Sequence, residues 1–282
     1  MHDTLPAAIL VATDMSPRGD RALARAVDLA AAFGARLAVL HVVDEDLPAS
    51  LRAALIPQAE RLLAEQVAAL PAAAEVAWTV TVMAGVDVAA IVEQAEQRGA
   101  GLVVLGMHRE HPFRGIVFGT TAERVMRSGH CPVLVAKGAY RGPYRHILAA
   151  VDDSRAAGRA LAAAARCWPQ ATVQAVHVDD VPAPLDGLAG TAFAAEPRPA
   201  WPAHLAPALA DVEAATGRRP ALLVQPGDDV ADALRALADR FAADLVAVGS
   251  AAGNRPMRAL LGGTAERILD LAPCDVLVVP PG

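Results

Sequence analysis

The chain has 282 residues, a formal net charge of −6, 54% hydrophobic residues and only 4% aromatic residues. This acidic balance excludes a general nucleic-acid-binding surface, which would need a basic stripe to neutralise phosphates. No apolar run reaches the roughly 18 residues that a membrane-spanning helix needs, and the N-terminus lacks the pattern of a signal peptide. At about 100–200 residues per domain, the length fits two domains. We therefore expect a cytoplasmic, two-domain protein with neither nucleic acid nor membrane as a partner.

The sequence repeats itself, which predicts a tandem duplication. Four segments of the first half recur in the same order in the second half. The matched segments are 9–16 with 147–154, 39–42 with 175–178, 84–89 with 226–231, and 119–124 with 262–267. A short polar stretch with Gly138, Gly142 and Pro143 separates the copies and is typical of a linker. We predict domain 1 at residues 1–138, domain 2 at residues 145–282, and a linker at about 138–145.

Within the first copy, strand signals alternate with helix signals. Ser16 offers an N-cap, Pro17 suits the first helical position, and Gly34 supplies a stop, which predicts a helix over 17–33. Short apolar runs typical of buried parallel strands occur at 8–13, 36–43, 75–83, 102–106 and 133–136. Further helices are predicted at 58–70, 87–98 and 121–128. The second copy follows the same order over 147–279, so the fold class is α/β, with two repeated doubly wound domains. Each has a five-stranded, mostly parallel sheet flanked by helices.

One segment of the second copy, residues 182–207, has no counterpart in the first. It contains six prolines and two glycines. Proline removes a helical hydrogen bond, so this composition predicts an irregular surface excursion. A passive loop is the simpler interpretation, and a lid over a site is the alternative.

The candidate site of each copy lies where connections diverge outside the carboxyl ends of the strands. The ends of strands one and two meet there with the loop that follows strand four. In the first copy this loop begins at Gly106 and ends with Gly119 and Thr120 at the next helix. Glycine lets a ligand approach the backbone closely, and the free N–H groups of a helix start attract anions. These residues predict a phosphate-bearing ligand.

The order of elements, the His-Val end of strand two and the Gly…Gly-Thr loop resemble the universal stress protein family, once per half and over nearly the whole chain. The resemblance implies an adenine nucleotide alpha hydrolase-like fold, with ATP, and Mg²⁺ if ATP is bound, as cofactor. In the family's nucleotide-binding members, an aspartate ending strand one and the backbone after strand two hold the adenosine, while the glycine loop holds the phosphates. The matching positions are Asp14, Val42, Gly106, Arg109, Gly119, Thr120 and Thr121 in the first half, and Asp152, Val178, Gly249, Gly253, Gly262, Gly263 and Thr264 in the second.

Both halves depart from the family's pattern of Gly, two residues, Gly, nine residues, Gly, and Ser or Thr. In the first half Arg109 occupies the second glycine position, where a guanidinium either crowds the phosphate path or binds phosphate. In the second half the pattern returns only after a one-residue shift, which uses Gly253, Gly263 and Thr264. Thr120 also has a ligand-free explanation, because with Glu123 it forms a capping box.

The histidines and cysteines are expected to have structural roles. His108 and His111 lack a third ligand at a suitable spacing, so no metal site is predicted. His41 and His177 end equivalent strands and are expected to be hydrogen-bonded structural residues. The cysteines form neither a disulfide framework nor a zinc spacing and are Cys131, Cys167 and Cys274.

The predicted function follows from the resemblance: a stress-response protein that binds an adenine nucleotide and acts through protein partners. One alternative is a nucleotide-independent interaction protein whose site residues are structural. The other is a slow ATP hydrolase, for which the sequence offers no positioned base, so no catalytic residue is assigned. The last strands, 133–136 and 275–279, are edges that invite pairing. The resemblance implies that the two halves pair as an intramolecular pseudo-dimer, and a homodimer is a further possibility.

Overall fold

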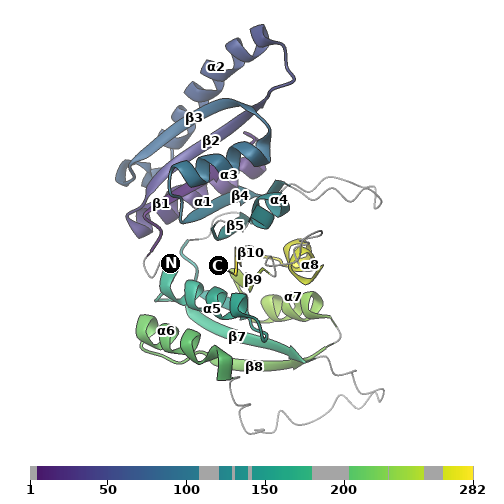
Figure 1. Ribbon diagram of the computed structural model, residues 1–282. Helices are drawn as coiled ribbons and strands as arrows, with labels where there is room; N and C mark the ends of the chain where they lie inside the picture. The colour runs from purple at the N-terminus through teal and green to yellow at the C-terminus, as the bar shows by residue number, and fades with distance from the viewer. Residues whose placement is uncertain are drawn as a thin grey trace. The chain divides into compact units, whose positions relative to one another are not determined.

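Each half of the chain forms a compact unit in the computed structural model (Figure 1): unit 1 ends at Gly142 and unit 2 spans Pro143–Pro281. The structure describes residues 5–107, 121–128, 131–138, 142–179, 203–227, 229–250 and 263–281.

Unit 1 is a doubly wound α/β domain. Its strands are all parallel, in the order β3-β2-β1-β4-β5. The strands are β1 (Ala8–Ala12), β2 (Arg36–Asp44), β3 (Trp78–Gly85), β4 (Leu102–Gly106) and β5 (Val133–Ala136). The helices are α1 (Pro17–Phe33), α2 (Ala49–Ala68), α3 (Asp87–Gln97) and α4 (Thr121–Ser128), with a 3₁₀ helix η1 (Pro71–Glu75).

Unit 2 repeats this architecture, with parallel strands in the order β8-β7-β6-β9-β10. The strands are β6 (His146–Ala150), β7 (Thr172–Asp179), β8 (Ala221–Pro226), β9 (Leu245–Gly249) and β10 (Asp275–Val279). The helices are α5 (Arg155–Cys167), α6 (Ala206–Thr216), α7 (Val230–Arg240) and α8 (Gly263–Leu271), with a 3₁₀ helix η2 (Ala203–Leu205). The predicted fold class is confirmed in both units.

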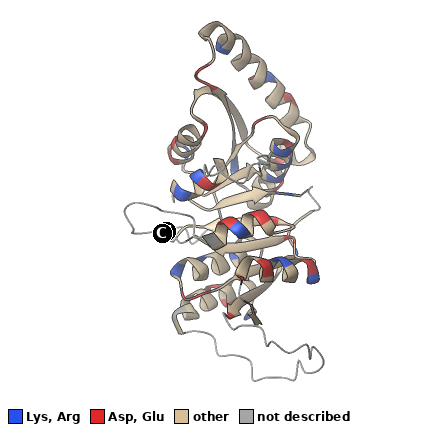
Figure 2. Ribbon diagram, turned by 90° about the vertical axis from the view of Figure 1, so that its right-hand side faces the viewer, with Lys and Arg blue, Asp and Glu red and all other residues tan. Residues whose placement is uncertain are grey.

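The central strands are buried on both faces. Successive residues such as Leu10 and Val11 in β1 are fully buried, and the same holds for Val103 and Val104 in β4. Figure 2 shows that Lys, Arg, Asp and Glu lie mainly on the helices and loops, whereas the strands carry few of them. This distribution is typical of a parallel sheet covered on both sides.

The first helix begins and ends as the sequence predicts. Ser16 has an extended backbone, and its side chain accepts hydrogen bonds from the N–H groups of Arg18 and Gly19. Pro17 occupies the first helical position, and Gly34 closes the helix in the left-handed region at φ 63°, where glycine is favoured.

The helix predicted at 58–70 is instead α2, which begins at Ala49 and contains Pro57. Proline lacks the N–H that continues a helix and usually interrupts one. The structure compensates by packing Leu55 and Ile56, just before the proline, against the buried cluster that contains Leu63 and Val82.

Two other predicted boundaries are wrong. The third strand was expected over 75–83, but β3 starts at Trp78, the residue that pairs with Leu37 near the start of β2. The irregular excursion was expected to reach residue 207, but α6 begins at Ala206 with Pro207 in its first turn, where the missing N–H costs no helical hydrogen bond. Residues 182–202 of that excursion lie outside the described residues, and so does the alternative prediction of a lid.

Candidate functional site

Each unit has a cavity at the point where its strand order reverses. In unit 1, β1 lies between β2 and β4, so connections diverge beside its carboxyl end. A cavity of about 330 Å³ lies there, and its lining includes Asp14, Val42, Gly106 and Thr121. The structure therefore brings together the predicted site residues of the first half that it describes. Arg109, Gly119 and Thr120 lie outside the described residues.

The carboxylate of Asp14 is positioned by the start of α1. Its Oδ1 accepts hydrogen bonds from Ser16 N at 3.0 Å and from Ser16 Oγ at 2.6 Å. Ser16 Oγ in turn accepts from the backbone N–H groups of Arg18 and Gly19, both at 3.3 Å. One hydroxyl thus caps the helix and fixes the carboxylate at the cavity, although Asp14 itself is exposed.

The backbone of Val42 faces the same cavity because β2 continues past the end of β1. The last partners in the register are Ala12 and Leu40, and Thr13 N then donates to Leu40 O at 3.0 Å. Alternate residues of a parallel strand direct their N–H and C=O groups to the same neighbouring strand. Val42 therefore points both groups to the β1 side, beyond the end of β1. A donor and an acceptor are presented there side by side.

Two glycines bring α1 close to the strand ends. A Cβ on Gly106 would lie 2.8 Å from the carbonyl oxygen of Arg18, and one on Gly19 would lie 2.3 Å from Thr13 Oγ1 and 2.7 Å from Asp14 Oδ1. Side-chain carbons essentially never come so near to other heavy atoms. Gly106 thus has a packing reason that is independent of any phosphate, and Gly19 makes room for the carboxylate of Asp14.

His41 is a structural residue, as predicted. Its Nδ1 lies 2.8 Å from the carbonyl oxygen of Thr13, and since a carbonyl only accepts, Nδ1 carries the proton and donates. In unit 2, His177 makes the same contact with the carbonyl of Val151 at 2.9 Å. The bond ties the ends of neighbouring strands together at the rim of each cavity.

The unit 2 cavity has about 220 Å³ and is lined by Asp152, Val178, Gly249 and Thr264 together with other residues. Asp152 Oδ1 accepts from Ser154 N at 2.8 Å, as Asp14 does from Ser16 in unit 1. Gly263 opens α8, whereas Gly253 and Gly262 lie outside the described residues.

Unit 2 keeps the backbone geometry but fills part of the space. Val151 N donates to Val176 O at 2.8 Å. Val178 therefore also points its N–H and C=O groups to the β6 side, beyond the end of β6. Ala157 occupies the position of Gly19, and Val151 that of Thr13. These larger or less polar side chains match the smaller cavity of unit 2.

Several cavity residues were not singled out from the sequence. The unit 1 lining also contains Thr13, Arg18, Gly19 and Asp87, which come from helix starts and a strand end. A glycine three residues after a capping serine was a detectable signal for Gly19. The place of Arg18 depends on how closely α1 approaches β4, which no local pattern encodes.

The cysteines are free and half-buried. Burial raises the pKa of Cys131 to about 11, against a smaller lowering by a backbone hydrogen bond with Val103. Burial likewise raises the pKa of Cys167 to about 11, against a smaller lowering by Arg166. Such thiols stay protonated near neutral pH and are poor nucleophiles.

At pH 8 we expect iodoacetamide to alkylate Cys131 and Cys167 about a hundredfold more slowly in the folded chain than in urea, because a pKa near 11 instead of 9.0 leaves about one hundredth of the thiolate. Peptide mass spectrometry over time measures both rates. Equal rates in the two states would contradict the assignment of these thiols as buried and protonated.

Within the described residues, no group of three or more His, Cys, Asp or Glu side chains is arranged to hold a metal ion. His108 and His111 lie outside that part of the chain. No described helix has the length and apolar character to cross a membrane.

Fold and cavities together define a class: a tandem of two doubly wound α/β domains, each with a cavity at the point where its strand order reverses. The sequence profile of the Universal stress protein family matches residues 7–137 and again 143–280. The chain belongs to this family, which confirms the resemblance seen in its motifs.

Individual relatives agree with this assignment. The chain is similar to Universal stress protein MJ0531 of Methanocaldococcus jannaschii, with 35% identity over 139 residues, covering 46% of this chain and 81% of the relative. It is also similar to Universal stress protein A homolog 1 of Coxiella burnetii, with 27% identity, covering 45% of this chain and 92% of that protein. A crystal structure of a universal stress protein from Archaeoglobus fulgidus shares the fold, with a TM-score of 0.73 and 22% identity over 98% of this chain and 99% of that chain.

Proposed function

We propose that both cavities bind adenine nucleotides, with the base and ribose at the ends of the first two strands and the phosphates toward the start of the last helix. The observation that carries the proposal is that Val42 and its counterpart Val178 each line a cavity, where the strand register directs their N–H and C=O groups to the side of the shorter first strand. Adenine offers the complementary edge, an amino donor beside a ring-nitrogen acceptor.

The carboxylates support the same assignment. Asp14 and Asp152 stand at equivalent positions in the two cavities, and a carboxylate only accepts hydrogen bonds. The natural donors on a nucleoside are the ribose hydroxyls and the base amino group. At the other end of each cavity, Thr121 and Thr264 lie at the starts of α4 and α8, where free N–H groups favour anions.

The larger cavity, in unit 1, is the stronger candidate. It has about 330 Å³ against about 220 Å³ in unit 2, and Arg18 adds a cation to its lining. Membership of the family supports a role in the stress response through protein partners. Pairing of the two halves as a pseudo-dimer stays a prediction.

Calorimetric titration of the nucleotide-free full chain with ATP and GTP, both with Mg²⁺, tests the proposal. We expect ATP to bind at least about tenfold more tightly than GTP, because guanine carries an acceptor where adenine carries its amino donor. Absence of heat with millimolar ATP would refute nucleotide binding. Equal affinities would refute recognition of the base by the backbone of Val42 and Val178.

A further inference from the structure

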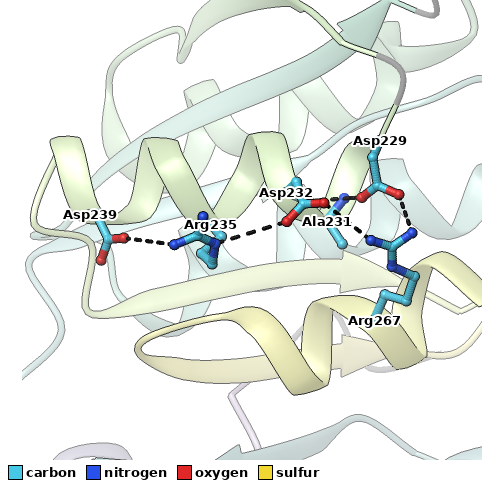
Figure 3. Close-up of polar contacts among 6 residues, drawn as sticks. All are labelled: Asp229, Ala231, Asp232, Arg235, Asp239 and Arg267. Carbon is cyan, nitrogen blue, oxygen red and sulfur yellow. Dashed lines mark hydrogen bonds and ion pairs between the residues drawn. The ribbon is translucent and has the colours of Figure 1, made fainter.

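An ion-pair cluster joins α7 and α8 in unit 2 (Figure 3). Arg267, in the first turns of α8, contacts Asp229 Oδ2 through its Nη1, and its Nη2 lies 3.2 Å from Asp232 Oδ2. Asp229 is the N-cap of α7, and Asp232 lies in the first turn of that helix. A single guanidinium therefore joins the starts of two helices.

The cap of α7 does not depend on this guanidinium. Asp229 Oδ1 accepts from the N–H groups of Ala231 and Asp232, both at 2.9 Å, while the ion pair uses the other oxygen. Asp232 has a second cationic neighbour, since Arg235 Nε lies 4.0 Å from its Oδ1. If the Arg267 side chain moves away, Asp229 still caps α7 and Asp232 still has Arg235 as a cationic neighbour.

The cluster borders a further cavity that adjoins the unit 2 cavity. This space, of about 310 Å³, is lined by Asp229, Val230, Ala231, Thr264 and Arg267. It shares Val230 and Thr264 with the unit 2 cavity. Arg267 is thus near the end of the site toward which the phosphates of a bound nucleotide would extend.

The ion pair with Asp232 is the more exchangeable of the two. The side chains of Arg267 and Asp232 are 52% and 54% exposed, whereas that of Asp229 is 27% exposed, so water and salt weaken the attraction to Asp232 most. A phosphate can accept two parallel, charge-assisted hydrogen bonds from one guanidinium, whereas each carboxylate here contacts a single nitrogen of Arg267. A terminal phosphate near Thr264 therefore competes well for Arg267.

We propose that Arg267 is the phosphate-specificity residue of unit 2: it is held by Asp232 and Asp229 when the site is empty and is transferred to the terminal phosphates of a bound nucleotide. The inference rests on the proposed nucleotide binding and deepens it, because it makes unit 2 select a nucleoside di- or triphosphate over the nucleoside. Unit 1 has Arg124 and Asp87 at matching positions but Ala90 in place of Asp232. A second carboxylate that competes with phosphate for the arginine is thus present at this position in unit 2 and absent from the matching position in unit 1.

The test is calorimetric titration of the full chain with ATP and with adenosine, in an Asp14→Asn background that weakens unit 1. Arg267→Gln is expected to lower the affinity for ATP about tenfold and to leave the affinity for adenosine unchanged. Asp232→Asn, which removes a competing charge, is expected to raise the affinity for ATP two- to threefold without changing that for adenosine. Unchanged adenosine binding also verifies that each variant is folded.

Arg219→Gln is the matched control. It removes the same charge from an exposed side chain that pairs with Glu213 and precedes the amino end of β8, so ATP affinity should not change. The inference is overturned if Arg267→Gln leaves ATP affinity unchanged, or lowers the affinities for ATP and adenosine equally. If the unvaried chain binds neither ligand, the proposed function fails too. If it binds both with equal affinity, only the role of Arg267 fails.

Discussion

Replacing Gly249 by alanine is expected to destabilise unit 2 by about 3 kcal/mol, near the upper end of the usual cost of overpacking a tight site. The added Cβ would lie 2.4 Å from the carbonyl carbon of Ala156 and 2.5 Å from the nitrogen of Ala157. Both are backbone atoms at the start of α5, so relief requires moving the helix or the strand. Hydrogen exchange of the β9 and β10 segments, measured as a function of urea, reports the loss for unit 2 separately from unit 1.

Gly227→Ala is the control within the same unit. Its Cβ would meet nothing closer than Val178 Cγ1 at 3.5 Å, an ordinary van der Waals contact, so stability should change little. In unit 1, Gly106→Ala should also destabilise, since its Cβ would lie 2.8 Å from a backbone oxygen of Arg18. If Gly249→Ala were as stable as Gly227→Ala, close packing of helix and strand would not explain the glycine.

Replacing Asp14 by asparagine is expected to weaken ATP binding in unit 1 by at least about tenfold, or roughly 1.4 kcal/mol. The amide keeps an oxygen for the hydrogen bonds from Ser16, so the start of α1 is preserved. What is lost is the negative charge, which strengthens hydrogen bonds from ribose or amino donors. Calorimetric titration with ATP measures the change, and thermal unfolding checks that the fold persists.

Asp152→Asn is the counterpart in unit 2, where Asp152 contacts Ser154 in the same way. Each single variant should weaken one class of sites, and the double variant should weaken both. If the double variant kept its full affinity for ATP, the carboxylates of Asp14 and Asp152 would have no part in nucleotide recognition. The contribution of the backbone would not be affected by that result.

The fold was predictable because its signals are local and repeated. Ser16, Pro17 and Gly34 mark the limits of α1, and short apolar runs identify β4 and β5 at the observed residues. The second copy then supports each assignment independently. By contrast, the start of α2 was missed because Pro57 is tolerated by tertiary packing, and packing overrides local preference.

The site was predictable in outline and not in its details. Asp14 and Val42 follow from strand ends, which a reader of the sequence can locate. Gly106 and Arg267 contact residues that are distant in sequence, Arg18 in one case and Asp229 in the other. Their roles emerge only when helix and strand ends are placed together in space.

The unequal lengths of neighbouring strands have an evolutionary consequence. The groups that would read the base belong to the main chain of Val42 and Val178, exposed because β2 and β7 extend beyond β1 and β6. No side-chain substitution can delete a main-chain amide, so base selectivity can outlast extensive sequence drift. Side chains that fill the cavity are then one way in which a copy can lose its ligand. Ala157, at the position of Gly19, places an extra methyl group at the smaller of the two cavities.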